Sequence, residues 1–398
     1  MSARSLLAEQ HPAESDGRQF TNPSSLRPRD QLNPLTSLRF FAAMQVVVFH
    51  FAQIRVENAP LPIRNLVASG YTGVSLFFVL SGFILAYNYL DKDLSWRGGA
   101  RFFLIARFAR IYPVYALGLL VSIPFFLKDH AIAGTVGLSH YAQMTVVATV
   151  FLQQAWIPGM ATAWNGPGWS LSVEAFFYAC FPRIASLIQR VPASRAILAI
   201  LALFLLGLAV PAAYGMQRQR GIWAAPVVDT SGIAFVTYNP LLHIPEFLIG
   251  MLAAKAFLHT RSSTGHRTLL SLYSPVLCAG LIALVLVNSS RIPYLMLHNG
   301  LLAPAYAALI VGLARGGDPL SKLLSHPALV LLGESSYATY ILHVPIALWL
   351  RQLLDPVHHA VLLPLVYGIT VLLLPLAVLL TFERPARSMI RSRLGVRR

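Results

Sequence analysis

The stretch LTSLRFFAAMQVVVFHF, residues 35–51, decides the fold class. It is almost wholly apolar and close to the length of about 20 residues that an α-helix needs to cross a bilayer. Two ionisable side chains interrupt it, Arg39 near its start and His50 near its end. Ionisable groups within a membrane are costly and normally face a partner or a polar cavity. The stretch therefore predicts a transmembrane helix that carries part of a functional site.

The composition of the whole chain extends this prediction. Of its 398 residues, 56% are hydrophobic and only 12% are charged, whereas soluble domains carry about 25% charged residues. We therefore expect an all-α, polytopic membrane protein. The net charge of +16 fits the cytoplasmic excess of Lys and Arg in membrane proteins. Nucleic-acid binding is not expected, because no basic soluble domain exists to support it.

Eleven apolar stretches are candidate spans, and the positive-inside rule chooses among them. If all eleven cross, the 31 Lys and Arg divide into 14 inside and 17 outside, but without 139–157 the division is 24 to 7. We therefore expect ten transmembrane helices with both termini cytoplasmic, and 139–157 to be re-entrant or to lie at the outer boundary. The stretches are 35–55, 70–90, 111–127, 139–157, 168–189, 195–214, 237–258, 268–288, 297–314, 329–350 and 359–381.

The domain organisation follows from these spans. Residues 1–34 are polar and rich in Pro and Ser and lack the apolar core of a signal peptide, which predicts a disordered cytoplasmic tail. Residues 35–387 form the expected membrane domain, and 388–398 a basic cytoplasmic tail. We expect a multi-pass protein of the cell (cytoplasmic, inner) membrane.

Arg39 and His50 share one face of the first helix. Eleven residues separate them, which returns to within about 20° of the same direction and gives a rise of about 16 Å. Each has an ordinary alternative: Arg39 could be an anchor that reaches the membrane interface, and His50 a buried histidine bonded to a neighbouring helix.

A second candidate group lies in NGPGWSLSVEAFFYACFP, residues 165–182. The Asn-Gly-Pro-Gly turn predicts that a helix enters the membrane from outside, which places Glu174 about 9 Å deep and close to the expected depth of His50. A carboxylate beside an imidazole fixes its tautomer and raises its basicity, as a general base requires. The alternative is a glutamate paired with an arginine or with the helix start. Trp169 and Ser170 are expected to support the substrate site.

Three further ionisable residues are expected in the outer half of the membrane. His243 and Glu246 in NPLLHIPEFLIG are three residues apart and so share a helix face. His343 in SSYATYILHVPI lies in an ascending span, with Tyr337 before it. We expect these four residues to bind or support the substrate. No metal-binding spacing such as HExxH appears, so no metal is expected.

On the inner side, GGARFFLIARFARIYPVY, residues 98–115, contains Arg107 and Arg110 on one helix face. They suit either an interfacial helix against anionic headgroups or a paired clamp for phosphates. The small residues of GYTGVSLFFVLSGFILAYNY, residues 70–89, suit either close helix contact or space for an elongated ligand. The sequence alone does not choose between the two alternatives for either stretch.

Six stretches, taken in order, resemble the acyltransferase-3 family of integral membrane O-acyltransferases. The resemblance implies ten transmembrane helices and transfer from cytoplasmic acyl-CoA, most simply acetyl-CoA, to a hydroxyl of a carbohydrate or glycoconjugate at the outer face. The family's functional residues fall on Arg39, His50, Arg107, Arg110 and Glu174. The stretches are LTSLRFFAAMQVVVFHF, GYTGVSLFFVLSGFILA, RFARIYP, WSLSVEAFFYACFP, SSYATYILHVPI and FERPAR.

This resemblance implies two roles for these residues at two depths of the membrane. Arg39, Arg107 and Arg110 would hold the phosphates of the donor, and His50, supported by Glu174, would take the proton of the acceptor hydroxyl, a step worth about 10²–10⁴ in rate. A covalent acyl-histidine intermediate is equally compatible. The competing class is a proton-coupled transporter or flippase, although no internal inverted repeat is visible. A lipid-interacting scaffold without chemistry is a weaker alternative.

Overall fold

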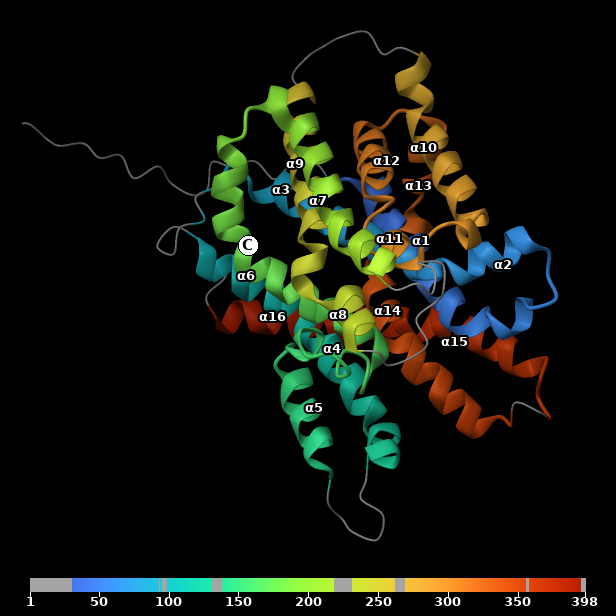
Figure 1. The fold of residues 1–398 in the computed structure, drawn as a ribbon. Helices are drawn as coiled ribbons and strands as arrows, with labels where there is room; N and C mark the ends of the chain where they lie inside the picture. Colours follow the sequence, from blue (N-terminus) through green and yellow to red (C-terminus); the bar gives the residue numbers. More distant parts are fainter. Residues whose placement is uncertain are drawn as a thin grey trace, which may run out of the picture. The chain divides into compact units, whose positions relative to one another are not determined.

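The computed structural model describes residues 31–92, 94, 99–130, 138–217, 231–261, 269–355 and 358–394. The regular elements of this part of the chain are all helices (Figure 1). The expected tail up to residue 30 lies outside the described residues, as do residues 395–398. The boundary expected after residue 387 falls inside helix α16, Arg384–Arg393.

Within the described ranges, eight segments are long and apolar enough to cross a membrane. They coincide with eight of the ten expected spans and establish an all-α, multi-pass membrane protein. The remaining two expected spans correspond to α10, Leu269–Val287, and α14, Pro327–Leu353. The eight segments are Asn33–Ala52, Leu61–Tyr89, Ala100–His130, Gly166–Arg190, Ala193–Tyr214, Pro240–Thr260, Tyr294–Arg315 and Leu362–Arg393.

The stretch 139–157 does not form a spanning helix. Its helix α5, His140–Val150, has 11 residues and a length of about 16 Å, about half of the bilayer core. It lies against the C-terminal half of α4, Ala100–His130 (Figure 1): Tyr141 lies 6.0 Å from His130 between ring centroids, and the Tyr115 hydroxyl donates to the carbonyl of Thr149 at 2.8 Å. The chain therefore descends along α4 before the next long helix, α6 (Trp169–Arg190), begins.

The helices that carry the predicted site residues have defined relative directions. Helix α1, Asn33–Ala52, runs parallel to α14, since Gly333 packs on the carbonyl of Thr36 and His343 contacts His50 further along both helices. Helix α4 is also parallel to α14.

The contacts between α4 and α14 follow the same order on both helices. The hydroxyl of Tyr337 donates to the carbonyl of Ile111, and Nε1 of Trp349 donates to the carbonyl of Val121 at 3.0 Å. Helix α6, Trp169–Arg190, is antiparallel to both, because its first residues contact Tyr340 while Tyr178 lies among the arginines nearer the start of α4.

The small residues of α3, Gly73–Tyr89, have two different surroundings. A Cβ at Gly82 would collide with the carbonyl of Phe247 in α9, Ile244–Arg261, and one at Gly250 of α9 would collide with the carbonyl of Val79. Such close backbone contact is typical of membrane helix pairs. Ser81, on another face of α3, lines a pocket instead.

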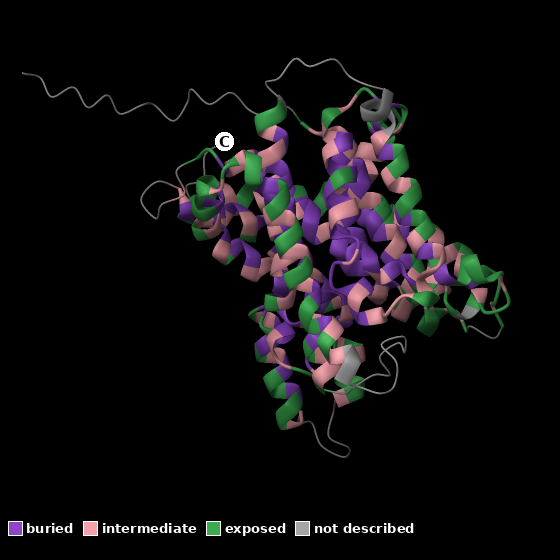
Figure 2. Ribbon diagram, turned by 45° about the horizontal axis from the view of Figure 1, so that its top comes forward, coloured by how far each residue is buried: buried purple, intermediate pink, exposed green. Residues whose placement is uncertain are grey.

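Buried side chains concentrate at the centre of the described bundle, and exposed ones follow its periphery (Figure 2). Helix α7, Ala196–Gln217, exposes large leucines such as Leu198 and Leu205. Exposed aliphatic side chains on a long apolar helix are expected where the neighbour is lipid. The polar residues of the site therefore lie inside a bundle whose outer surface is apolar.

Candidate active site

A pocket in the described chain, which we call the arginine pocket, lies between α1, α3, α4, α6 and α14. Arg39 of α1, Arg107 and Arg110 of α4, and Glu174 of α6 all line it. Two distant stretches of sequence thus place three guanidinium groups around one cavity. Arg107 and Arg110 both line this pocket, as the phosphate-clamp alternative requires.

The arginine pocket carries an excess of positive charge. Arg39 interacts electrostatically with Arg107, Arg110 and Glu174. Within the described ranges, none of the three arginines forms an ion pair with a carboxylate. Arg107 instead donates from Nη2 to the hydroxyl of Tyr89 at 3.4 Å, with its guanidinium over the Tyr89 ring. Like charges gathered without direct counter-charges are typical of a site for an anion.

A fourth guanidinium, which the sequence analysis missed, belongs to Arg387 on α16. Helix α16 packs against α4, and Arg387 interacts electrostatically with Arg107 and Arg110. Glu383 offsets part of this charge, since it interacts with Arg110 and Arg387. The FERPAR stretch was the available signal, but its position beside α4 is a tertiary contact.

Glu174 belongs to the arginine pocket, and its expected pairing with His50 was wrong. Its Oε1 atom accepts hydrogen bonds from the hydroxyl of Ser81, at 3.1 Å, and from that of Tyr178. The contacts of His50 lie elsewhere, with Val46 and His343. The alternative of a glutamate among arginines describes this residue better.

The depth of Glu174 was misjudged because α6 does not begin at the membrane surface. The turn before α6 is buried: Asn165 is 4% exposed and donates from Nδ2 to the carbonyl of Ile341 at 3.0 Å. Ser170 and Tyr340 share a hydrogen bond of 2.9 Å. Helix α6 therefore starts already level with the middle of α14, and six further residues carry Glu174 about 9 Å deeper.

His50 contacts a second histidine. Its Nδ1 atom lies 3.0 Å from the carbonyl oxygen of Val46 and 3.2 Å from Nε2 of His343. His343 is fully buried, and its Nδ1 lies 2.7 Å from the carbonyl oxygen of Tyr340. His50 as a whole residue is exposed, although its ring contacts to Val46 and His343 are partly buried. The expectation that His343 supports the site now has a direct contact, while its role stays a prediction.

The arginine pocket approaches this histidine pair along the helices. Tyr340 lines the pocket and lies one helical turn before His343, with 6.1 Å between ring centroids. Phe77, also in the lining, packs edge-on against Tyr340 at 5.7 Å. Along α1, Arg39 and His50 are about 16 Å apart by helical rise. The arginines and the imidazoles thus lie at different levels along α1 and α14. We call this line of side chains, from Arg39 through Tyr340 to His343 and His50, the column.

The remaining predicted supporting residues divide into two groups. Ser170 and Tyr337 line the arginine pocket. Trp169, His243 and Glu246 belong to a separate buried cluster, in which the Trp169 ring lies 5.5 Å from that of His243.

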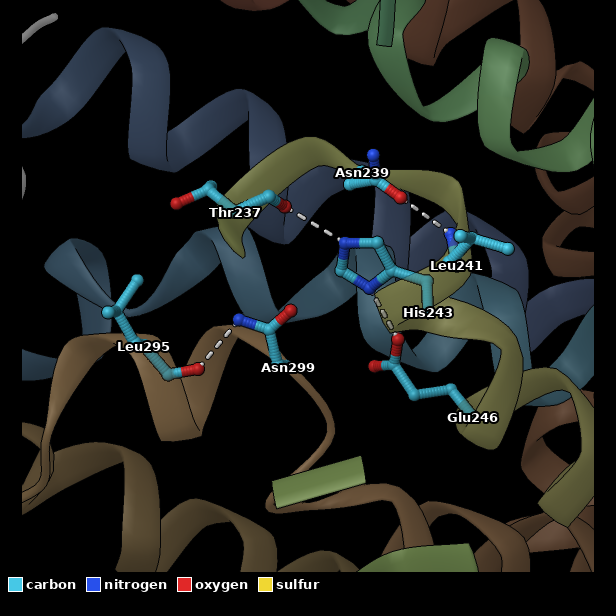
Figure 3. Close-up of polar contacts among 7 residues, drawn as sticks. All are labelled: Thr237, Asn239, Leu241, His243, Glu246, Leu295 and Asn299. Atoms are coloured by element: carbon cyan, nitrogen blue, oxygen red, sulfur yellow. Dashed lines mark hydrogen bonds and ion pairs between the residues drawn. The ribbon is translucent and has the colours of Figure 1, made fainter. Parts of the chain in front are cut away.

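In this cluster His243 and Glu246 are one-turn neighbours, as expected, and each is 1% exposed (Figure 3). Nδ1 of His243 lies 2.6 Å from Oε2 of Glu246, and Nε2 lies 2.9 Å from the carbonyl oxygen of Thr237. Both ring nitrogens therefore have partners within the protein. Among the described residues, no group of three or more His, Cys, Asp or Glu side chains is arranged to hold a metal ion.

The sequence is similar to those of several known proteins. The sequence model of a family described as an acyltransferase domain matches residues 34–382. Acyltransferase MdmB of Streptomyces mycarofaciens is 29% identical over 79% of this chain and 78% of its own length.

Two glycan-related proteins also match. Exopolysaccharide production protein ExoZ of Rhizobium meliloti is 28% identical over 69% of this chain and 75% of its own length. A putative peptidoglycan O-acetyltransferase, YrhL of Bacillus subtilis, is 24% identical over 78% of this chain and 48% of its own length. No solved structure matches.

Proposed function

The chain belongs to the acyltransferase-3 family, and from this premise we propose that it transfers an acyl group from cytoplasmic acyl-CoA to a hydroxyl of a carbohydrate or glycoconjugate at the outer face. Acetyl is the proposed acyl group. The observation that carries the proposal is the meeting of Arg39, Arg107 and Arg110 in one pocket. Its lining includes Tyr340, the ring neighbour of His343, and His343 contacts His50.

Acyl-CoA suits both ends of the column. Its phosphates carry several negative charges, and a thin pantetheine arm separates them from the reactive thioester. Guanidinium groups bind phosphate through charge-assisted, often bidentate hydrogen bonds. The apolar lining residues Val74, Phe77 and Ile84 provide a suitable wall for the arm, and the thioester would then lie toward the histidine pair.

The orientation in the membrane is part of the proposal. Helices α1, α4 and α14 run parallel, as ten alternating spans require. The helices that correspond to the ten expected spans are α1, α3, α4, α6, α7, α9, α10, α12 (Ala303–Arg315), α14 and α15 (Leu362–Val378). With 24 of 31 Lys and Arg inside, the positive-inside rule puts both termini in the cytoplasm. The arginine pocket then opens toward cytoplasmic acyl-CoA, and His50 lies toward the outer face of the cell membrane.

The transfer step uses His50 as the base. Its Nε2 takes the proton of the acceptor hydroxyl while the oxygen attacks the thioester carbonyl. The new C–O bond forms, the C–S bond breaks, and the leaving CoA thiolate receives the proton from the imidazolium. In the covalent alternative, Nε2 attacks the thioester carbonyl, the C–S bond breaks and CoA leaves as the thiolate. The hydroxyl oxygen then attacks the acyl group, the C–N bond to the ring breaks, and the hydroxyl proton goes to the thiolate.

The acceptor class draws support from the relatives. One is named for exopolysaccharide production and another for peptidoglycan O-acetylation. Both names point to glycans built or displayed beyond the cytoplasm, which agrees with an acceptor that reaches His50 from the outer side. A polysaccharide or a lipid-linked glycan is therefore the proposed partner.

The decisive experiment measures thiol release from acetyl-CoA by the purified protein in nanodiscs, with and without a membrane glycan extract. We expect glycan-dependent release by the wild type and loss of about 10²-fold or more in His50→Ala. His358→Ala is a matched control, because that side chain is 77% exposed and outside the column. Equal release by His50→Ala would refute the assignment of the base. Solute movement driven by a proton gradient, without release from any acyl-CoA, would favour a transporter.

A further inference from the structure

Two imidazole rings meet where α1 and α14 run side by side. Nδ1 of His50 lies 3.2 Å from Nε2 of His343, and the ring centroids are 5.0 Å apart at an angle of 47°. A hydrogen bond between two neutral imidazoles requires one nitrogen to donate and the other to accept. The neighbouring carbonyl groups determine which is which.

Each ring has a backbone carbonyl against its Nδ1 atom. The carbonyl of Val46 lies 3.0 Å from Nδ1 of His50, and the carbonyl of Tyr340 lies 2.7 Å from Nδ1 of His343. A carbonyl oxygen can only accept, so both Nδ1 atoms carry hydrogen. Nε2 of His343 is then the acceptor, and the N–H of His50 is shared between it and Val46. This is one self-consistent arrangement of protons for two neutral rings.

In this arrangement the second nitrogen of His50 keeps its lone pair. Nε2 of His50 is the unprotonated ring atom of an exposed residue, whereas His343 is fully buried behind it. A general base must present its lone pair to the acceptor, and the hydrogen bond at the opposite nitrogen holds the ring in that tautomer and orientation. In Ser-His-Asp triads the aspartate carboxylate accepts this hydrogen bond from the Nδ1–H of the histidine. Here the buried partner is an imidazole.

We infer that His343 is the positioning residue for His50: its Nε2 accepts the Nδ1–H of His50 and thereby directs Nε2 of His50 toward the acceptor hydroxyl. The inference rests on the proposed function of His50 as base. When His50 takes the proton, the same bond becomes charge-assisted, with the lone pair of His343 and the carbonyl of Val46 both facing the cation. Glu174, which was expected to do this, lies with Ser81 and Tyr178 instead.

Two amide variants of one position test the inference. In His343→Gln the amide oxygen can take the place of Nε2 and accept from His50. In His343→Asn the shorter amide can replace Nδ1 and donate to the carbonyl of Tyr340, but it leaves His50 without that acceptor. We expect kcat within about threefold of wild type for Gln and a fall of about 10- to 100-fold for Asn, the range for one hydrogen bond to a charged group. The donor KM should stay within about twofold for both.

The opposite ranking would overturn the inference, because retained kcat in Asn and lost kcat in Gln would mean that His343 only anchors to Tyr340. A wild-type kcat in His343→Leu would overturn it as well. The double variant His50→Ala/His343→Asn should be no slower than His50→Ala, because His343 acts through His50. A further fall would contradict this. Full activity of His50→Ala would refute the proposed function of His50 as the base. That result does not involve the His343 variants, so failure of the proposed function and failure of this inference can be distinguished.

Discussion

The charge of the arginine pocket leads to a prediction about Arg39 that separates binding from stability. Replacing Arg39 by Gln removes a guanidinium that has no ion pair with a carboxylate within the described ranges and that repels Arg107 and Arg110. In most proteins the loss of a half-buried arginine lowers stability. Here the free protein should keep its stability or gain some, while binding of the donor should weaken.

The magnitudes follow from the pocket. One charge-assisted hydrogen bond to a phosphate contributes about 1.5–3 kcal/mol, so CoA should bind about 10- to 150-fold more weakly. Two cations near a protein surface repel by about 1–4 kcal/mol at an effective dielectric constant of about 20, before screening by salt. The relief of repulsion therefore offsets the lost contacts of the side chain, and the thermal midpoint without ligand should fall by no more than about 2 °C.

The assay compares the thermal unfolding midpoint of the protein in nanodiscs with and without CoA, together with the KM for acetyl-CoA. Arg101→Gln is the matched control, because this exposed arginine precedes Arg107 on α4 and does not line the pocket. It should change neither quantity. If Arg39→Gln lowered the midpoint by several degrees and left the affinity for CoA unchanged, Arg39 would be a structural anchor and the assignment of the donor site would be wrong.

Three further predictions follow from the same contacts. Glu174→Gln keeps an oxygen that accepts the hydrogen bonds from Ser81 and Tyr178. We therefore expect kcat at saturating donor to stay within about threefold of wild type, and the donor KM to change. A loss of kcat equal to that of His50→Ala would show that Glu174 is the partner of His50 after all. Arg387→Gln should raise the donor KM by about three- to tenfold, with kcat unchanged, measured by steady-state kinetics at two salt concentrations. Gly250→Leu should destabilise the bundle by about 1–3 kcal/mol in thermal unfolding, whereas Gly280→Leu, where a Cβ meets nothing within 4 Å, should be neutral.

Two residues near the start of α1, Thr36 and Ser37, contact other parts of the bundle. The hydroxyl of Ser37 donates to the carbonyl of Leu324, and the carbonyl of Thr36 receives Gly333 in close contact. These two positions therefore hold α1 against its neighbours. Arg39 interacts electrostatically with Glu174 on another helix.

Much of this protein was determined by sequence alone. The apolar length of each span is a local property, and so the all-helical membrane class and eight of the spans were predicted correctly. The one-turn pair of His243 and Glu246 was also predicted, since helical spacing places residues three apart on one face. The asymmetry of Lys and Arg, summed over the chain, indicated that 139–157 does not cross.

Only the tertiary structure decided which side chains meet. Depth was assigned on the assumption that each helix starts at the membrane surface, but the chain descends along α4 before α6 begins, and Glu174 therefore lies with the arginines. His343 reaches His50 because α1 and α14 run parallel and in contact. The rise and the face of a helix follow from periodicity, whereas the axial offset between two helices depends on how loops and side chains pack between them. The identity of each partner is therefore a property of the bundle as a whole.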